Sequence, residues 1–135
     1  MKNILALITL VTILAGCTEV IIPADFQLNE ESIFKVNNEY ISIDSSLTVE
    51  IVNIQDSRCP SDVVCVWQGE ALVEIEVKEI QTYSTVLSTY DNQIDTLGNY
   101  SIELVDIKPY PVSDKAIKTK DYDLTLKIKP ISSEN

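Results

Sequence analysis

Residues 65–78, with the sequence CVWQGEALVEIEVK, decide the fold class. Apolar side chains occupy most odd positions from Cys65 to Val77, while most even positions carry Gln, Glu or Lys. A period of two places alternate side chains on opposite faces of a β-strand, so that one face is buried and the other is solvated. We therefore expect a half-buried strand over residues 65–77, with Trp67 on the buried face.

Similar alternation recurs along the chain, and no stretch longer than a turn has helical periodicity. Further strands are expected at 32–36, 40–43, 47–54, 83–90, 100–107 and 122–128. Asn37 and Asn38 favour a hairpin turn between the first two, since Asn tolerates a positive φ. The apolar phase changes at Val52, which indicates a β-bulge, and it changes again at Val105. Seven or eight one-sided strands predict an all-β domain, either an antiparallel β-sandwich or a small barrel.

The segments between these strands are rich in turn-forming residues. Residues 91–99 and 109–120 are expected to form loops, because Asp, Asn, Gly and Pro recur in them. The polar, β-prone stretch 83–90 is expected to be an edge strand.

Composition excludes several classes of function. The chain has 135 residues, enough for one domain, and no histidine. The absence of imidazole removes Ser-His-Asp and Cys-His catalysis and His-ligated metal sites. Ten basic residues against 21 acidic ones argue against a nucleic acid as partner, because phosphate binding needs clustered positive charge.

The first sixteen residues are typical of an export signal. A short positive start precedes an apolar run over 4–15, whose helical length of about 18 Å is too short for a hydrocarbon core of about 30 Å. The sequence LAGC at 14–17 resembles a bacterial lipobox, which implies cleavage after Gly16 and lipidation of Cys17. The alternative is an ordinary cleaved signal followed by an incidental cysteine.

These features predict four segments: a cleaved signal peptide at 1–16, a tether at 17–29, a β-sandwich domain at 30–131 and a tail at 132–135. Without Lys2 the chain keeps 9 basic and 21 acidic side chains, a net charge of −12. We expect a protein held outside the cytoplasm in the cell envelope by the lipid on Cys17. Thr18 follows the cysteine in place of aspartate, which favours the outer membrane if the envelope is Gram-negative.

The rarest residues of the chain gather within residues 58–67. This stretch contains the single arginine, the single tryptophan, and both cysteines other than Cys17. Outside the cytoplasm Cys59 and Cys65 are expected to form a structural disulfide, stabilising the fold by about 2.4 kcal/mol in the chain-entropy model. Their C-x5-C spacing argues against a C-x-x-C redox site, and two thiolates without imidazole leave a zinc site incomplete.

Arg58 and Trp67 each have two interpretations. Arg58 is expected to form a bidentate pair with Asp56 or Asp62 that pins the loop, and the alternative is that it binds a ligand carboxylate. Trp67 is expected to pack against the disulfide in the core, whereas a sugar-stacking tryptophan would be exposed.

The segment from Asp56 to Ala71 resembles a signature of small, uncharacterised bacterial secreted proteins and lipoproteins, D-S-R-C-P-x-x-V-x-C-x-W-x-G-x-A. The segments 98–104, 109–111 and 121–122 are similar to the second half of that family, so the resemblance covers about residues 33–129. It implies a β-rich domain and supplies no activity.

Weaker patterns suggest other sites. Asp91, Asn92 and Asp95 with Asp121 or Asp123 offer oxygen ligands for Ca²⁺, although loop Asp and Asn are common as turn formers. No metal or cofactor is therefore expected.

Two further patterns concern surfaces. Glu74 and Glu76 lie on the solvated face of one strand, about 6.6 Å apart, a separation that inverting glycosidases use but that a solvated strand face also produces. Four tyrosines offer an aromatic binding surface, although Tyr is also a good strand former: Tyr83, Tyr90, Tyr100 and Tyr110.

The sequence favours a non-catalytic, membrane-anchored binding or structural module that takes a protein or glycan of the envelope as ligand. The alternative is an inhibitor or decoy of a cationic envelope or host hydrolase, such as a lysozyme or protease, favoured by the negative charge and the disulfide-closed loop. A carboxylate-dependent hydrolase is the third hypothesis. No enzymatic activity is expected.

Overall fold

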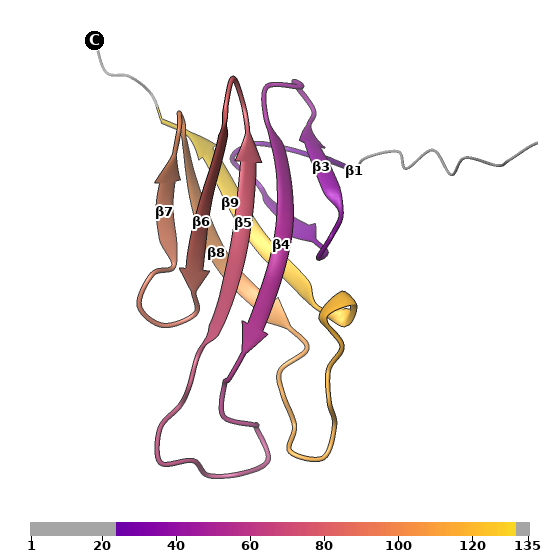
Figure 1. The fold of residues 1–135 in the computed structure, drawn as a ribbon, viewed down its shortest axis with the longest axis vertical. Coiled ribbons are helices and arrows are strands. Elements are labelled where there is room, and N and C mark those ends of the chain that lie inside the picture. The colour runs from indigo at the N-terminus through magenta and orange to yellow at the C-terminus, as the bar shows by residue number, and fades with distance from the viewer. Residues whose placement is uncertain (1–23, 132–135) are drawn as a thin grey trace, which may run out of the picture.

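A computed structural model describes residues 24–131, which form a sandwich of two β-sheets (Figure 1). The nine strands are β1 Ala24–Phe26, β2 Glu31–Phe34, β3 Glu39–Ser42, β4 Thr48–Asp56, β5 Ala71–Lys78, β6 Thr82–Ser88, β7 Ile94–Leu97, β8 Tyr100–Lys108 and β9 Asp123–Pro130. A single 3-10 turn, η1 Thr119–Asp121, precedes β9. The all-β sandwich expected from the sequence is confirmed, with nine strands rather than seven or eight.

One sheet has the strand order β1-β3-β4-β5-β6, and the other has the order β2-β9-β8-β7. All pairings between these strands are antiparallel except that of β1 with β3. The hairpin expected at Asn37 and Asn38 is wrong, because β2 and β3 belong to different sheets. The chain between Phe34 and Tyr40 passes from one sheet to the other, since β2 pairs with β9 and β3 with β4. Both side chains are buried, and Asn37 between them has a φ of 60°.

The core lies between the sheets and comes from the alternating faces that the sequence predicts. In β5 the buried positions are every second residue, and β9 follows the same pattern. The buried side chains of these two interior strands are Ala71, Val73, Ile75, Val77, Leu124, Leu126 and Ile128.

Both changes of apolar phase mark irregularities in strand pairing. The register of β4 against β5 shifts between Ile51 and Asn53, and that of β8 against β9 shifts between Leu104 and Asp106. An extra residue in one strand exchanges its two faces, so the apolar side chains on each side of the shift both point inward. The bulge expected at Val52 is therefore confirmed.

Three boundaries differ from the sequence-based expectation. The long strand begins at Ala71 rather than at 65, and the expected loop 91–99 contains β7. The first strand, β1, lies inside the expected tether 17–29, and the side chain of Phe26 is buried, so a domain boundary at residue 30 is too late. The edge position of β6 and the loop over 109–118 agree with expectation. No helix among residues 24–131 has the length and apolar character needed to cross a membrane.

Three connections meet at one end of the sandwich, the lower end in Figure 1. They are the β4–β5 connection over 57–70, the β6–β7 connection over 89–93 and the β8–β9 connection over 109–122. The first of them projects furthest, while β1 and the end of β9 lie toward the opposite end (Figure 1). We call the three connections the loop end and residues 57–70 the projecting loop.

Candidate functional site

Arg58 and Asp56 form an ion pair at the base of the projecting loop. Nε of Arg58 donates to Oδ1 of Asp56 at 2.9 Å and Nη2 donates to Oδ2 at 2.6 Å, while the backbone N–H of Arg58 adds a third bond to Oδ1 at 3.0 Å. Arg58 is only 8% exposed. Of the two partners expected for Arg58, the structure selects Asp56, and the pair is bidentate.

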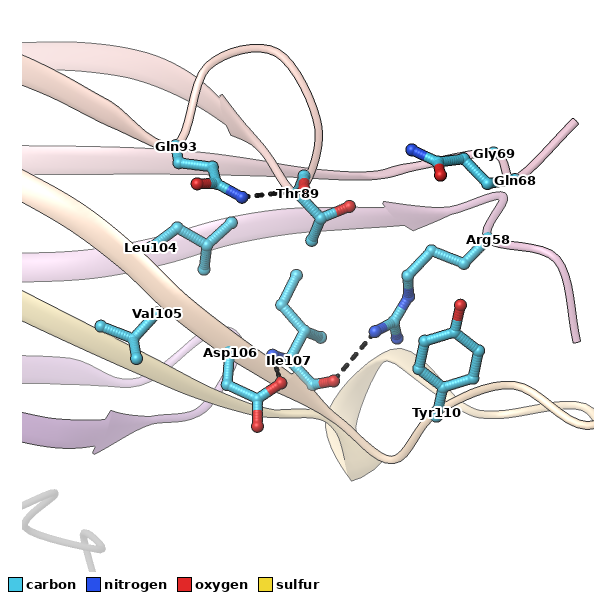
Figure 2. A pocket seen from close by; sticks show the side chains of 10 residues that line it. All are labelled: Arg58, Gln68, Gly69, Thr89, Gln93, Leu104, Val105, Asp106, Ile107 and Tyr110. Carbon is cyan, nitrogen blue, oxygen red and sulfur yellow. Dashed lines mark hydrogen bonds between the residues drawn. The ribbon is translucent and has the colours of Figure 1, made fainter. Parts of the chain in front are cut away.

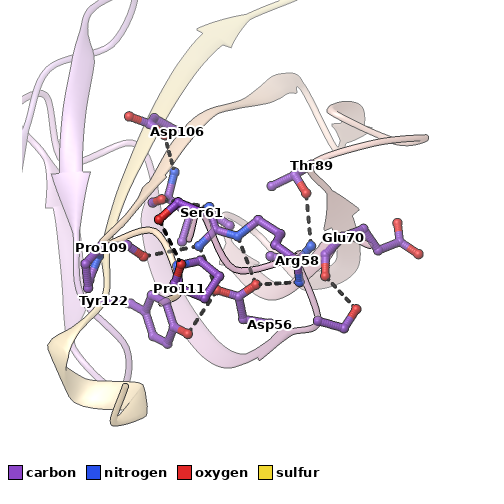
Figure 3. Close-up of polar contacts among 12 residues, drawn as sticks. Asp56, Arg58, Ser61, Glu70, Thr89, Asp106, Pro109, Pro111 and Tyr122 are labelled. Carbon is purple, nitrogen blue, oxygen red and sulfur yellow. Dashed lines mark hydrogen bonds and ion pairs between the residues drawn. The ribbon is translucent and has the colours of Figure 1, made fainter. Parts of the chain in front are cut away.

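The same guanidinium connects the projecting loop to the second sheet (Figure 3). Its Nη1 donates to the carbonyl oxygen of Ile107 at 3.0 Å and its Nη2 to that of Pro109 at 3.2 Å. The ring of Tyr110 lies 4.6 Å from the guanidinium carbon, a cation–π contact. Protein groups accept hydrogen bonds from Nε, Nη1 and Nη2, which is the arrangement expected of a structural clamp.

Tyr122 completes the clamp. Its hydroxyl donates to Oδ2 of Asp56 at 3.0 Å. Burial opposes ionisation of Asp56, but the hydrogen bonds from Arg58 and Tyr122 outweigh it and lower the pKa of that carboxyl. Burial and the hydrogen bond to Asp56 raise the pKa of Tyr122 to about 12. At neutral pH the clamp therefore holds an ionised carboxylate and a neutral phenol.

Asp62, the other expected partner of Arg58, forms hydrogen bonds with Ser113 instead. It accepts hydrogen bonds from the backbone N–H of Ser113 at 2.9 Å and from its hydroxyl at 2.5 Å. The backbone N–H of Ser61 also donates to the carbonyl of Pro111 at 3.0 Å. These bonds tie the outer part of the projecting loop to the 109–122 connection.

The disulfide expected between Cys59 and Cys65 is confirmed, with the two Cα atoms 6.0 Å apart. Between the disulfide and the sheet, the pairing of β4 with β5 continues into the projecting loop. The N–H of Ser57 donates to the carbonyl of Glu70 at 2.8 Å and that of Cys59 to Gln68 at 2.7 Å. The projecting loop thus has a paired base and a covalently closed tip.

Trp67 is the main correction to the sequence-based interpretation, because its side chain is 81% exposed instead of buried. The alternation breaks at Gly69, whose φ of +64° turns the chain away from strand geometry. A Cβ at Gly69 would lie 1.9 Å from the carbonyl oxygen of Ser57, so the turn requires glycine. Residues 65–68 lie beyond the end of the sheets, where no second layer covers them.

Two neighbouring valines are exposed together with Trp67. Val64 and Val66 are fully exposed, and we call these three residues the tip patch. The sequence carried one signal of this outcome: residues 63–67, VVCVW, are apolar at both odd and even positions, unlike the one-sided strand that follows.

Two pockets flank the backbone of Gln68 and Gly69. The first, of about 310 Å³, runs from Arg58 and Tyr110 along β8 to Leu104 and Val105 (Figure 2). Thr89 and Gln93 form its opposite wall, and the side-chain amide of Gln93 donates to the carbonyl of Thr89 at 3.0 Å.

The second pocket, of about 350 Å³, lies between the projecting loop and the 89–93 connection, and we call it the aromatic pocket. It is lined by Ser57, Trp67, Gln68, Gly69, Glu70, Tyr90 and Asp91. Sequence reasoning missed this grouping, because Glu70 and Tyr90 lie twenty residues apart and meet only through the pairing of β5 with β6.

The remaining sequence candidates do not converge. Within residues 24–131 no three Cys, Asp or Glu side chains are placed to hold a metal ion. Asp95 accepts a hydrogen bond from Thr85, and Asp123 pairs with Lys35 at 2.5 Å. Glu74 and Glu76 lie on the outer face of β5, alternating with buried residues.

The four tyrosines do not form one surface. Tyr100 is buried and Tyr83 packs against the core, whereas Tyr90 and Tyr110 are exposed in different pockets. Tyr83 and Tyr100 therefore fit the alternative of strand-forming tyrosines, and only Tyr90 joins Trp67 in a pocket.

Comparisons of the chain with models of known protein families, with curated proteins and with solved structures found no match. The signal peptide expected at 1–16 and the lipidation expected at Cys17 lie outside the residues that the structure describes, as does the tail at 132–135. The function is therefore inferred from the geometry of the loop end.

Proposed function

We propose that this protein is a lipid-anchored, non-catalytic binding module of the cell envelope, whose loop end binds an envelope protein or glycan outside the cytoplasm. The observation that carries the proposal is the tip patch: the single tryptophan and two valines are exposed on a loop that projects from the domain. Exposed apolar clusters on a soluble domain mark interaction sites, since leaving them in water opposes solubility.

The construction of the loop favours binding over a purely structural role. The Arg58–Asp56 pair, the disulfide and the hydrogen bonds of Asp62 hold the projecting loop in one conformation. A loop that is already ordered loses little conformational entropy when it binds, so more of its contact energy appears as affinity.

The position of the expected anchor supports the same proposal. Seven residues separate the start of a chain cleaved before Cys17 from Ala24, and they span at most about 25 Å. Since β1 lies toward the end of the sandwich opposite the projecting loop, a lipid on Cys17 would leave the tip patch facing away from the membrane (Figure 1). The net charge of −12 would also keep the domain away from anionic headgroups.

A second candidate function is the inhibition of a cationic hydrolase such as a lysozyme or protease. The observation that favours it is the shape of the projecting loop, a disulfide-closed protrusion of a kind that can enter an active-site cleft. The acidic charge would speed association with a basic enzyme.

The binding proposal is tested by photo-crosslinking in native envelope membranes. A tip variant replaces each residue of the tip patch by serine, and a matched control replaces three exposed isoleucines elsewhere, Ile33, Ile43 and Ile80. The wild type and the control are expected to crosslink to the same partner and the tip variant to lose it. A partner retained by the tip variant would contradict the proposal. If the crosslinked partner is a hydrolase and loses activity when this protein binds it, the second candidate function, inhibition, would be favoured.

The anchor is tested separately with Cys17→Ser in the full chain. The variant is expected in the soluble fraction after cell lysis, because without acyl chains the protein buries no lipid group in the bilayer. Membrane retention equal to that of the wild type would contradict the lipid assignment.

A further inference from the structure

We infer that the aromatic pocket binds a cationic side chain, the ammonium of a lysine or the guanidinium of an arginine, presented by a basic partner. This inference rests on the proposed binding function and names its ligand chemistry. The pocket lies beside the tip patch and shares Trp67 with it, so a partner that covers the tip would reach the pocket with a neighbouring residue.

The lining supplies both groups that attract a cation. Trp67 and Tyr90 are the aromatic residues of the lining, and Glu70 and Asp91 are its acidic residues; rings attract cations through their faces and carboxylates attract them by charge. No lysine or arginine of residues 24–131 lines the pocket, and neither carboxylate forms an ion pair within that range. The pocket therefore carries negative charge that the described part of the chain does not neutralise.

Ser88 holds the two walls of the pocket in place. Its buried hydroxyl donates to Oε2 of Glu70 and accepts the backbone N–H groups of Tyr90, at 3.0 Å, and Asp91, at 3.3 Å. The carboxylate from the projecting loop and the turn that carries Tyr90 are thus fixed by one atom. Ser88 bonds only one carboxylate oxygen of Glu70, Oε2.

The chain already binds one cation with the same chemistry. On the other side of the Gln68–Gly69 backbone, the guanidinium of Arg58 is held by the carboxylate of Asp56 and the ring of Tyr110. The aromatic pocket repeats this pairing of carboxylate and aromatic ring, with the difference that it opens to solvent and lacks its own cation among residues 24–131.

Charge favours a cation over a neutral ligand. Aromatic rings and carboxylates also occur in glycan sites, but a neutral sugar gains nothing from the net charge of −12 on the chain beginning at Cys17. A basic partner is attracted at long range by the whole domain and at contact by the pocket. A glycan is therefore the competing outcome of the experiment.

Trp67 makes the test direct, because it is the only tryptophan and lies in the pocket wall. The mature chain is titrated with penta-lysine and penta-arginine peptides, with a neutral penta-glutamine peptide and with an N-acetylglucosamine trimer, following tryptophan fluorescence and calorimetry. Saturable binding of a basic peptide alone is expected. Saturable binding of the saccharide alone, or of no probe, would overturn the inference.

A matched pair of variants separates the pocket from general charge. Glu70→Gln and Glu74→Gln each remove one negative charge and keep the side-chain shape, but Glu74 lies outside the pocket on the outer face of β5. Glu70→Gln is expected to weaken peptide binding about three- to tenfold and Glu74→Gln by less than about twofold. Equal weakening by both variants would mean non-specific attraction and would refute the site.

The two proposals fail in different ways. If basic peptides do not bind while the tip variant still loses its envelope partner, the pocket inference is wrong and the binding function stands. If the peptides bind through Glu70 while the tip variant keeps its partner, the pocket stands and the tip patch is not the binding surface.

Discussion

The carboxylate of Asp56 receives two side-chain hydrogen bonds from Arg58, at 2.9 Å and 2.6 Å, although both side chains are almost completely buried. This pair lies where the sandwich ends and the projecting loop begins. It joins the last residue of β4 to the carbonyl groups at the end of β8. The loop end therefore depends on an ion pair inside the protein.

Removing one partner of this pair is expected to be costly. Asp56→Ala should lower the free energy of unfolding by about 3 kcal/mol or more, since it leaves the buried guanidinium without its counter-charge. Lys35→Ala, which removes an ion pair between two half-exposed side chains, should cost less than about 1 kcal/mol. Urea denaturation measures both, and equal effects would show that the Arg58 pair contributes no more than a surface pair.

The raised pKa of Tyr122 predicts a loss of stability at alkaline pH. A tyrosine that titrates near its usual pKa of about 10 when unfolded but at about 12 when folded stabilises the protein fully below pH 10. That contribution disappears as the pH rises from about 10 to about 12. Tyr122→Phe lacks this group, so its stability difference from the wild type should shrink over that range in urea titrations. A constant difference would contradict the raised pKa that burial and the hydrogen bond to Asp56 give Tyr122.

Substitution of Gly69 is expected to disturb the base of the projecting loop. Gly69→Ala should destabilise the protein by at least about 2 kcal/mol, because the added Cβ meets the backbone oxygen of Ser57 at a positive φ. Gly98 also has a positive φ, but a Cβ there meets side-chain atoms of Glu79 and Tyr83 at 2.9 Å instead of backbone at 1.9 Å. Thermal unfolding that ranks Gly98→Ala as the more harmful change would contradict this account.

Trp67→Ala is expected to change the free energy of unfolding by less than about 0.5 kcal/mol, because the indole is mostly solvated. Phe34→Ala, which removes a fully buried ring, should cost about 3 to 5 kcal/mol. Chemical denaturation of the two variants compares them directly. A loss of several kcal/mol on removing Trp67 would place the indole in the core instead.

Removal of the disulfide is expected to loosen the loop without unfolding the sandwich. The double variant Cys59→Ala/Cys65→Ala should lose about 2 kcal/mol of stability, the value that chain entropy assigns to a short closed loop. Its far-UV circular dichroism should match that of the wild type, because the disulfide lies outside the strands. Disulfide reductase activity in the wild type, or free thiols in exported protein, would contradict a structural role.

Local patterns predicted the parts of the fold whose environment repeats along a strand. The one-sided runs that end at Val77 and Ile128 indicate two interior strands, β5 and β9, and the phase change at Val52 indicates a bulge. The hairpin predicted at Asn37 is wrong. Whether the two strands pair with each other or join different sheets depends on the elements against which Phe34 and Tyr40 pack. That choice is not a local property.

The candidate site likewise has parts that the local sequence predicts and a part that it does not. The spacing of Cys59 and Cys65 and the two aspartates near Arg58 are local features, so they predict the disulfide and an ion pair of Arg58, but they leave the choice between Asp56 and Asp62 open. The aromatic pocket unites Trp67 on one connection with Tyr90 on another. No pattern within either segment indicates the other.

The amino-acid order alone determined an all-β domain, a loop closed by Cys59 and Cys65, and an ion pair of Arg58. The alternation of apolar residues and the spacing of the cysteines and aspartates can be read from residues close together in the chain. The tertiary structure decided that Arg58 is covered and Trp67 is not. Burial depends on whether a second layer of the protein reaches a side chain, and the sheets end before the tip of the projecting loop.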